Sequence, residues 1–250
     1  MGEAWFSWRG VDSRAMGVIV QTYPPIMLPA ERVEELKIPG RAGSLLRTEG
    51  EAVYESYLKT VEIANRPHAD PRAIAAWLRG SGPLIFGNEP MFVYQARILK
   101  EASLGKTFPR AYSGSVSFLC QPCKAAVDPD SPTTLDLTEA EAATSWTRYN
   151  PGDVPAKPLI TLTGTGTLSV TRSGGSTAYV ALAGTGAAGA VIDTDSMMVT
   201  DPAGAVLLNT AASVDADGYQ GLWLPPGELS TLTWSGTLTA ITIDPRWRWL

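Results

Sequence analysis

The chain has 250 residues, of which 44% are hydrophobic and 18% are charged. This composition can bury a core and excludes an intrinsically disordered chain. Residues 1–125 carry a net charge of +3 and residues 126–250 a net charge of −8, which together give the overall −5. The uneven charge indicates two domains. Because neither half has a dense basic patch, we expect no nucleic-acid binding.

The first half of the chain predicts short strands and one helix. Residues 5–8 and 17–20 are β-prone, and Tyr23–Pro29 holds three prolines, which favours an extended arm or a sheet edge over a central strand. The helix is predicted from Pro71 to Arg79, because Asp70 is a good N-cap and proline is tolerated at the first helical position. Gly80 is expected to end it.

Further strands are predicted after the helix, at 84–86, 91–98 and 115–120. The last of these alternates polar and apolar residues, which is typical of a strand with one buried face. Trp77 is expected to pack on the sheet, since a nine-residue helix is not stable alone.

The second half of the chain reads as strands without a helix. Turn and linker residues between 124 and 157 mark a boundary, and beyond Pro158 short β-prone segments recur about every 8–12 residues between glycine-rich turns. This pattern predicts an antiparallel β-sandwich. The chain ends in Trp247-Arg248-Trp249-Leu250, and we expect so apolar an end to dock on a domain.

Targeting and membrane signals are missing from the sequence. The first residues lack the basic and then apolar pattern of a signal peptide. Residues 173–192 carry no charge, but nine of the twenty are Gly, Ser or Thr, which favours strands and turns over a membrane helix. We therefore expect a soluble protein with no membrane span.

Several short motifs resemble catalytic or binding sites, and each lacks part of its pattern. Residues 184–189 have the glycine spacing of a dinucleotide site without the helix that should follow. Cys120 and Cys123 have neither the further ligands of a zinc site nor the helix of a redox motif, so we expect inert thiols and a chain made in a reducing cytoplasm.

The remaining polar candidates are isolated. His68 is the only histidine and is expected in a loop, where it has no nucleophile to activate. Asp215-Ala216-Asp217-Gly218 lacks the closing glutamate of a calcium loop. Asp193 and Asp195 can share one face of a strand, but no second carboxylate pair accompanies them. We predict no enzyme, no catalytic residues, no metal and no cofactor.

Six segments together resemble one family, the distal tail (Dit) proteins of siphophages that infect Gram-positive bacteria. Each matches a feature of that family in the same order along nearly the whole chain. They are Ile38–Leu45 with its Pro-Gly-Arg-x-Gly, Ile74–Leu78, Val116–Pro122, Asn150–Gly152 with Ala156–Ile160, Leu224–Gly227, and Ile243–Arg248. Glu228 departs from the family, which usually has asparagine after that late Pro-Gly turn.

The resemblance implies a mostly β protein with one short helix and two domains. Residues 1–125 would form an N-terminal ring-forming domain, joined by a C-terminal strand at 241–250. Residues 126–157 would be a linker, and residues 158–240 a galectin-like antiparallel β-sandwich.

The resemblance also implies a structural role in the virion, at the distal end of the tail. Six copies would form a ring that connects the tail tube protein to the tail-tip protein and the host-adsorption apparatus, with a receptor-binding protein as a possible further partner. Pro39, Gly40, Arg41 and Gly43 are candidates for the assembly contacts. They can instead form an ordinary turn with two glycines at positive φ, and the turn is the interpretation that we favour.

A different function remains open from the sequence. A β-sandwich can be a carbohydrate-binding module for cell-wall glycans, with Tyr179, Trp223 and Trp234 as its aromatic platforms. The same three rings can instead belong to the core.

Overall fold

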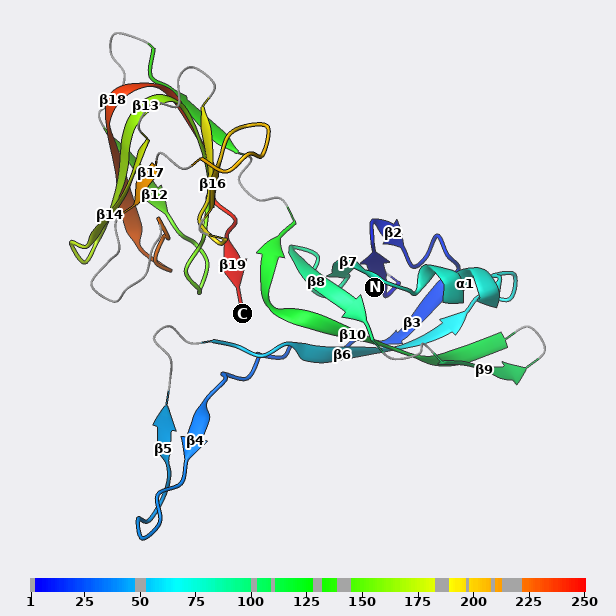
Figure 1. Cartoon of the computed structure of the whole chain (residues 1–250). Helices are drawn as coiled ribbons and strands as arrows, with labels where there is room; N and C mark the ends of the chain where they lie inside the picture. Colours follow the sequence, from blue (N-terminus) through cyan, green and yellow to red (C-terminus); the bar gives the residue numbers. More distant parts are fainter. Residues whose placement is uncertain are drawn as a thin grey trace. The chain divides into compact units, whose positions relative to one another are not determined.

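β-Strands make up most of the described chain, and α1 (Pro71–Trp77) is the one helix in it (Figure 1). The computed structural model describes residues 3–47, 53–99, 103–108, 111–127, 132–138, 145–182, 189–196, 198–207, 210–212 and 222–250. The chain forms two compact units, residues 1–127 together with Leu250 and residues 128–249. The predicted fold class, mostly β with one short helix, is confirmed.

The first unit is built on one antiparallel sheet with the strand order β2-β1-β7-β8-β10-β6-β3, and β9 pairs with β10. Its strands are β1 (Phe6–Trp8), β2 (Val11–Asp12), β3 (Val18–Thr22), β6 (Tyr57–Asn65), β7 (Ser81–Phe86), β8 (Phe92–Ile98), β9 (Ser103–Phe108) and β10 (Ala111–Ala126). β10 is the long central strand. Its register to β8 shifts between Cys120 and Lys124, so the strand passes through the cysteine motif instead of ending there.

One face of this sheet carries the core of the first unit. Alternate residues of β6 and β10 are buried, as the period of two in a half-buried strand requires. Phe118 meets Phe6 edge-on at a ring-centroid distance of 5.7 Å, and Trp77 stacks on Phe6 at 5.5 Å. The predicted packing of Trp77 against the sheet is therefore confirmed.

The helix begins where the sequence predicts and ends earlier. Asp70 is the N-cap, and its carboxylate accepts a 2.9 Å hydrogen bond from the Arg72 amide. Leu78 is the C-cap, and Gly80 follows two residues later with φ +82°. The prediction that the helix continues to Arg79 is wrong because the backbone leaves the helical conformation at Leu78.

A separate two-stranded sheet, β4 (Glu34–Leu36) paired with β5 (Leu45–Arg47), extends from the first unit. We call residues 24–46 together with 53–56 the arm. It continues the ribbon of β3 and β6, because Glu31 and Tyr54 form an isolated bridge beyond the last β3–β6 pair at Thr22 and Glu62.

The second unit is an antiparallel sheet in which the neighbours follow the order β11-β18-β13-β14-β17. β12 also pairs with β18, and β15 pairs with β13 and β16. The strands are β11 (Thr133–Asp136), β12 (Ser145–Tyr149), β13 (Leu159–Arg172), β14 (Thr177–Leu182), β15 (Ala190–Asp193), β16 (Met198–Thr200), β17 (Thr210–Ala212) and β18 (Leu229–Asp244). A two-residue strand, β19 (Arg248–Trp249), ends the chain.

Two long strands, β13 and β18, bend over and give this sheet two layers (Figure 1). The bend lies where Gly164 and Gly236 have φ +99° and +92°. A Cβ at Gly236 would lie 2.7 Å from the Gly166 Cα, so glycine is required for the close approach. One half of each strand pairs with β11 or β15 and the other half with β12 or β14, and the layers enclose a common apolar core.

One of the expected segment assignments needs correction. The stretch 126–157, expected as a linker, contains β11 and β12, and both pair with β18 of the second sheet. Within the segment 241–250, expected as a strand of the first domain, Ile241, Ile243 and Trp247 are buried in the core of the second unit, whereas β19 is grouped with β10 in the first sheet.

Candidate functional site

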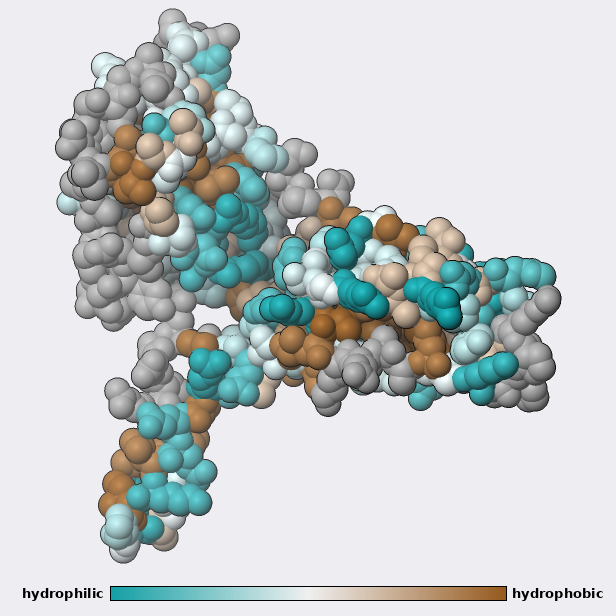
Figure 2. All heavy atoms as spheres, turned by 45° about the vertical axis from the view of Figure 1, so that its right-hand side comes forward, coloured by the Kyte–Doolittle hydropathy of each residue, from teal (hydrophilic) through white to brown (hydrophobic). Residues whose placement is uncertain are grey.

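The arm is the most exposed part of the first unit. Every side chain described from Ala30 to Leu46 is exposed except that of Ser44. Many of them are apolar, and the exposed fraction reaches 69% at Ile26, 76% at Leu28 and 68% at Leu46. Figure 2 shows hydrophobic and hydrophilic residues side by side along this arm.

The exposed apolar side chains lie on both strands of the arm and on both segments that lead to it. They are Ile26, Met27, Leu28, Val33, Leu36, Ile38, Leu45, Leu46 and Val53. Both faces of the hairpin take part, because Leu36 pairs with Leu45 while Leu46, one residue along β5, points to the opposite face. An isolated two-stranded hairpin is marginally stable in water, so this surface is suited to being covered by another protein surface.

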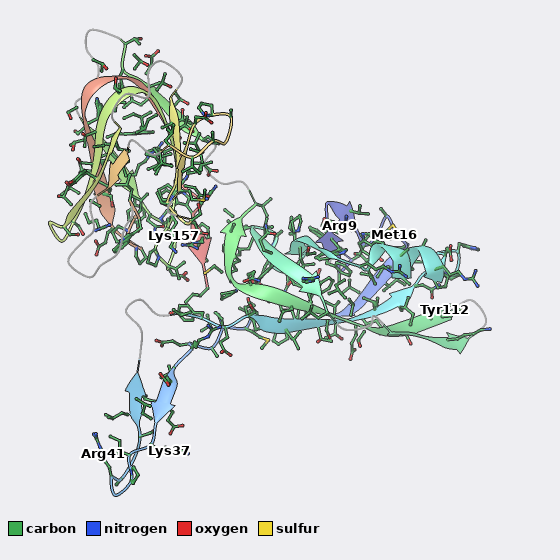
Figure 3. The ribbon with its side chains drawn as sticks, in the orientation of Figure 1. Arg9, Met16, Lys37, Arg41, Tyr112 and Lys157 are labelled. Carbon is green, nitrogen blue, oxygen red and sulfur yellow. The ribbon has the colours of Figure 1, made fainter. Side chains whose placement is uncertain are left out.

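The four assembly candidates form the tip of the arm. The Arg41 amide donates to the Ile38 carbonyl at 3.2 Å, with Pro39 and Gly40 at the two central positions of the turn. Gly40 and Gly43 have φ +82° and +81°, so the predicted turn with two positive-φ glycines is confirmed. Lys37 and Arg41 give the tip a positive charge (Figure 3).

The base of the arm is held by backbone hydrogen bonds. The Arg32 amide donates to the Val53 carbonyl at 2.6 Å, and the Glu55 amide donates to the Ala30 carbonyl at 2.8 Å. The side chains of Arg32 and Glu55 form a 3.5 Å ion pair that is largely exposed. Exposed pairs contribute little, so the backbone bonds set the position of the base.

A buried charged cluster lies in the first unit beside the root of the arm. Glu89 accepts from the Lys59 ammonium at 3.2 Å, from the Lys124 ammonium at 3.3 Å and from the Tyr94 hydroxyl at 2.6 Å. Lys59 is 1% exposed, and Glu89 and Lys124 are 8% exposed. Each ammonium also lies within 5 Å of an aromatic ring centroid, that of Tyr94 for Lys59 and that of Phe92 for Lys124.

The cluster keeps Glu89 ionised. Burial raises the pKa of this carboxyl, but the hydrogen bond from Tyr94 and the charges of Lys59 and Lys124 outweigh burial and hold the pKa below its ordinary value. Burial and the bond to Glu89 raise the pKa of the Tyr94 hydroxyl. The cluster therefore holds two lysines against one carboxylate, with Tyr94 as a neutral donor.

The sequence did not reveal this cluster. The signal that could have found it is Lys59, which shares the buried face of β6 with Val61 and Ile63 in the alternation of that strand. A charged residue at a core-facing position requires a partner. The partners come from the turn before β8 and from the part of β10 beyond the register shift, neither of which is near Lys59 in sequence.

The two cysteines and the single histidine lie on different elements of the first unit. Cys120 is buried, and burial raises the pKa of its thiol to about 12. Neither Cys120 nor Cys123 forms a disulfide. His68 lies exposed in the turn before the helix.

The remaining polar candidates are held in ion pairs, and the aromatic candidates differ in their surroundings. Asp193 pairs with Arg246 at 2.9 Å, and Asp195 pairs with Lys157 at 3.2 Å, so the two carboxylates serve different ion pairs. Arg172 stacks 4.0 Å from the ring centroid of Trp223. Of the other aromatic candidates for sugar binding, Trp234 packs against the core of the second unit and Tyr179 is 43% exposed.

Within the described ranges, no group of three or more His, Cys, Asp or Glu residues lies close enough together to hold a metal ion. Residues 184–188 and 215–218 lie outside the described residues, so the glycine motif and the Asp-Gly motif have no structural outcome. No helix among the described residues is long and apolar enough to cross a membrane.

The fold is similar to that of a solved structure over its whole length. The chain superposes on SPP1 Dit (gp 19.1) with a TM-score of 0.70 and 16% sequence identity, and the match covers 100% of both chains. The two proteins share one fold. SPP1 Dit is described as a paradigm of the hub adsorption apparatus in phages that infect Gram-positive bacteria.

The structural match confirms, at the level of the fold, the resemblance to distal tail proteins that the six sequence segments indicate. No protein-family profile matches the chain, and no curated protein matches it by sequence. At 16% identity the match shows a shared fold.

Proposed function

We propose that this protein is a phage distal tail protein, a structural ring subunit without enzymatic activity. Six copies form a ring that joins the tail tube protein to the tail-tip protein and the host-adsorption apparatus, at the distal end of the tail. The full-length match to SPP1 Dit supports the assignment. A ring closes when the same contact, repeated head to tail, returns to its start after six copies.

The observation that carries this proposal is the arm. A hairpin with apolar side chains on both faces is unfavourable in water. Burying this surface lowers the free energy by roughly 25 cal/mol for each Å² of apolar area. A second copy of the chain covers this surface in the ring. At the tip, Pro39, Gly40 and Gly43 fix the turn, and the Arg41 guanidinium can form a two-pronged contact with a carboxylate of the neighbour.

The test is the oligomeric state of the purified protein, measured by light scattering and by negative-stain microscopy. We expect six-fold rings for the natural chain. The double variant Leu28→Ser/Leu46→Ser removes two of the most exposed apolar side chains of the arm and should stay folded but lose the ring. Leu229→Ser, which replaces a leucine that is 56% exposed in the second unit, is the matched control and should keep the ring.

Two results would contradict the proposal. A natural chain that stays monomeric at the highest soluble concentration would refute the ring. Rings of unchanged stability in the arm variant would show that the arm is not an assembly contact.

A further inference from the structure

The root of the arm is a segment that cannot join the sheet. The ladder between β3 and β6 stops at Thr22 and Glu62 and resumes at the bridge of Glu31 with Tyr54. Between these points Pro24, Pro25 and Pro29 have no amide hydrogen to donate. Over eight residues the root therefore depends on other contacts to fix the direction in which the arm leaves the sheet.

A buried lysine supplies such a contact. The Lys59 ammonium lies 3.5 Å from the Pro25 carbonyl oxygen, within hydrogen-bonding distance. Among the hydrogen bonds described for the first unit, it is the one that reaches residues 24–29. A carbonyl in this segment has no strand partner, and an ammonium group has three donors to offer.

The charge balance of the cluster shows that the two lysines have different roles. Lys124 alone would neutralise Glu89, and Tyr94 donates to the Oε2 atom of the same carboxylate. Lys59 therefore adds a second buried positive charge that the carboxylate does not require. Burying a charge is costly unless it is paired and hydrogen-bonded, and the contact of Lys59 that Lys124 lacks is the one to Pro25.

We propose that Lys59 is a positioning residue that fixes the root of the arm and thereby the direction in which the arm meets a neighbouring copy. Glu89 and the ring of Tyr94 hold the ammonium in place, and its remaining donor binds the Pro25 carbonyl. The assembly role of the arm rests on the proposed function, whereas the fixing of the root is a property of the single chain.

The experiment compares Lys59→Met with Lys124→Met. Both variants remove one buried positive charge and leave Glu89 with one lysine and Tyr94, so their charge balance is equal. They differ in the bond to Pro25. Near-ultraviolet circular dichroism checks that each variant is folded, and native hydrogen exchange is followed at the amides of Arg32 and Glu55, which form the bonds at the base of the arm.

We expect exchange at these two amides to be at least tenfold faster in Lys59→Met and to change less than twofold in Lys124→Met. The protein concentration needed for half-maximal ring formation should rise at least tenfold in Lys59→Met only. Equal exchange rates in the two variants, whether both fast or both unchanged, would overturn the proposal.

Further outcomes separate the two proposals. If the natural chain forms no ring, the proposed function fails, and the exchange rates still decide the role of Lys59. If Lys59→Met does not fold, Lys59→Gln replaces it. Loss of folding in both would also overturn the proposal, because Lys59 would then be required by the whole unit and not by the arm root.

Discussion

The buried cluster makes a sharp prediction for Glu89→Gln. The amide keeps the size of the side chain but removes the one negative charge that faces two buried ammonium groups, at 3.2 and 3.3 Å. Removing one partner of a buried ion pair costs about 3–5 kcal/mol. For a unit of this size, 1 kcal/mol shifts Tm by about 4 °C, so we expect the transition of the first unit to fall by about 12–20 °C.

The assay is calorimetry over a pH series, with Glu62→Gln as the control. Glu62 is exposed on the opposite face of β6, so its substitution should change stability by no more than about 0.5 kcal/mol. Because the folded pKa of Glu89 is lowered, its contribution is complete above the ordinary carboxyl pKa of about 4.3 and is lost as the pH falls below that value. Glu89→Gln should remove this part of the acid destabilisation.

The reasoning is refuted if Glu89→Gln loses less than about 1 kcal/mol at pH 7. Such a result would mean that water reaches the two ammonium groups and solvates them when the carboxylate is gone. If Glu89→Gln lost as much stability at low pH as the natural chain does, the reasoning would also be contradicted, because the pH dependence would then arise from another group.

Three further substitutions test the local physics of the fold. Asp70→Ala should cost about 1 kcal/mol, measured by urea unfolding, because the Arg72 amide loses its cap; no loss would exclude capping as the cause of the helix start. Gly236→Ala should cost about 2–6 kcal/mol, since it combines a strained positive φ with overlap at Gly166, while Gly174→Ala, which meets no atom within 4 Å, should be nearly neutral; equal losses would argue against a glycine-dependent bend. In Cys123→Ser, the remaining thiol, Cys120, should resist maleimide at pH 8 until the chain is unfolded, because burial raises its pKa to about 12; rapid labelling of the native protein would contradict its burial.

The features that the sequence predicts well are those with a local cause. Asp70 and Pro71 predict the start of the helix, because an N-cap and a first-turn proline affect only the backbone within about three residues. The strand at 115–120 is predicted by its own alternation. The three prolines of Tyr23–Pro29 indicate a segment outside the sheet, which the arm root is.

The features that the sequence does not predict depend on distant partners. β11 and β12 read as linker because the residues of β18 with which they pair follow 80 to 110 residues later. The C-terminal segment is rich in apolar residues, but the sequence does not show that Ile241 and Trp247 belong to the core of the second unit. In the candidate site, the tip turn is visible in Pro39–Gly43, but the exposure of the arm is not, since apolar residues in a sequence favour burial.

The bent strands of the second unit also set an order for folding. Thr134 bonds to Thr242 across a sequence separation of 108 residues, so β11 cannot find its place until the last part of the chain has been made. The paired strands β6 and β10 of the first unit are complete by residue 126. A ribosome adds about 5–20 residues each second and domains fold as units. The first unit, with its arm, can therefore be folded for several seconds while the second is still being synthesised, and that arm is exposed before its own chain is finished.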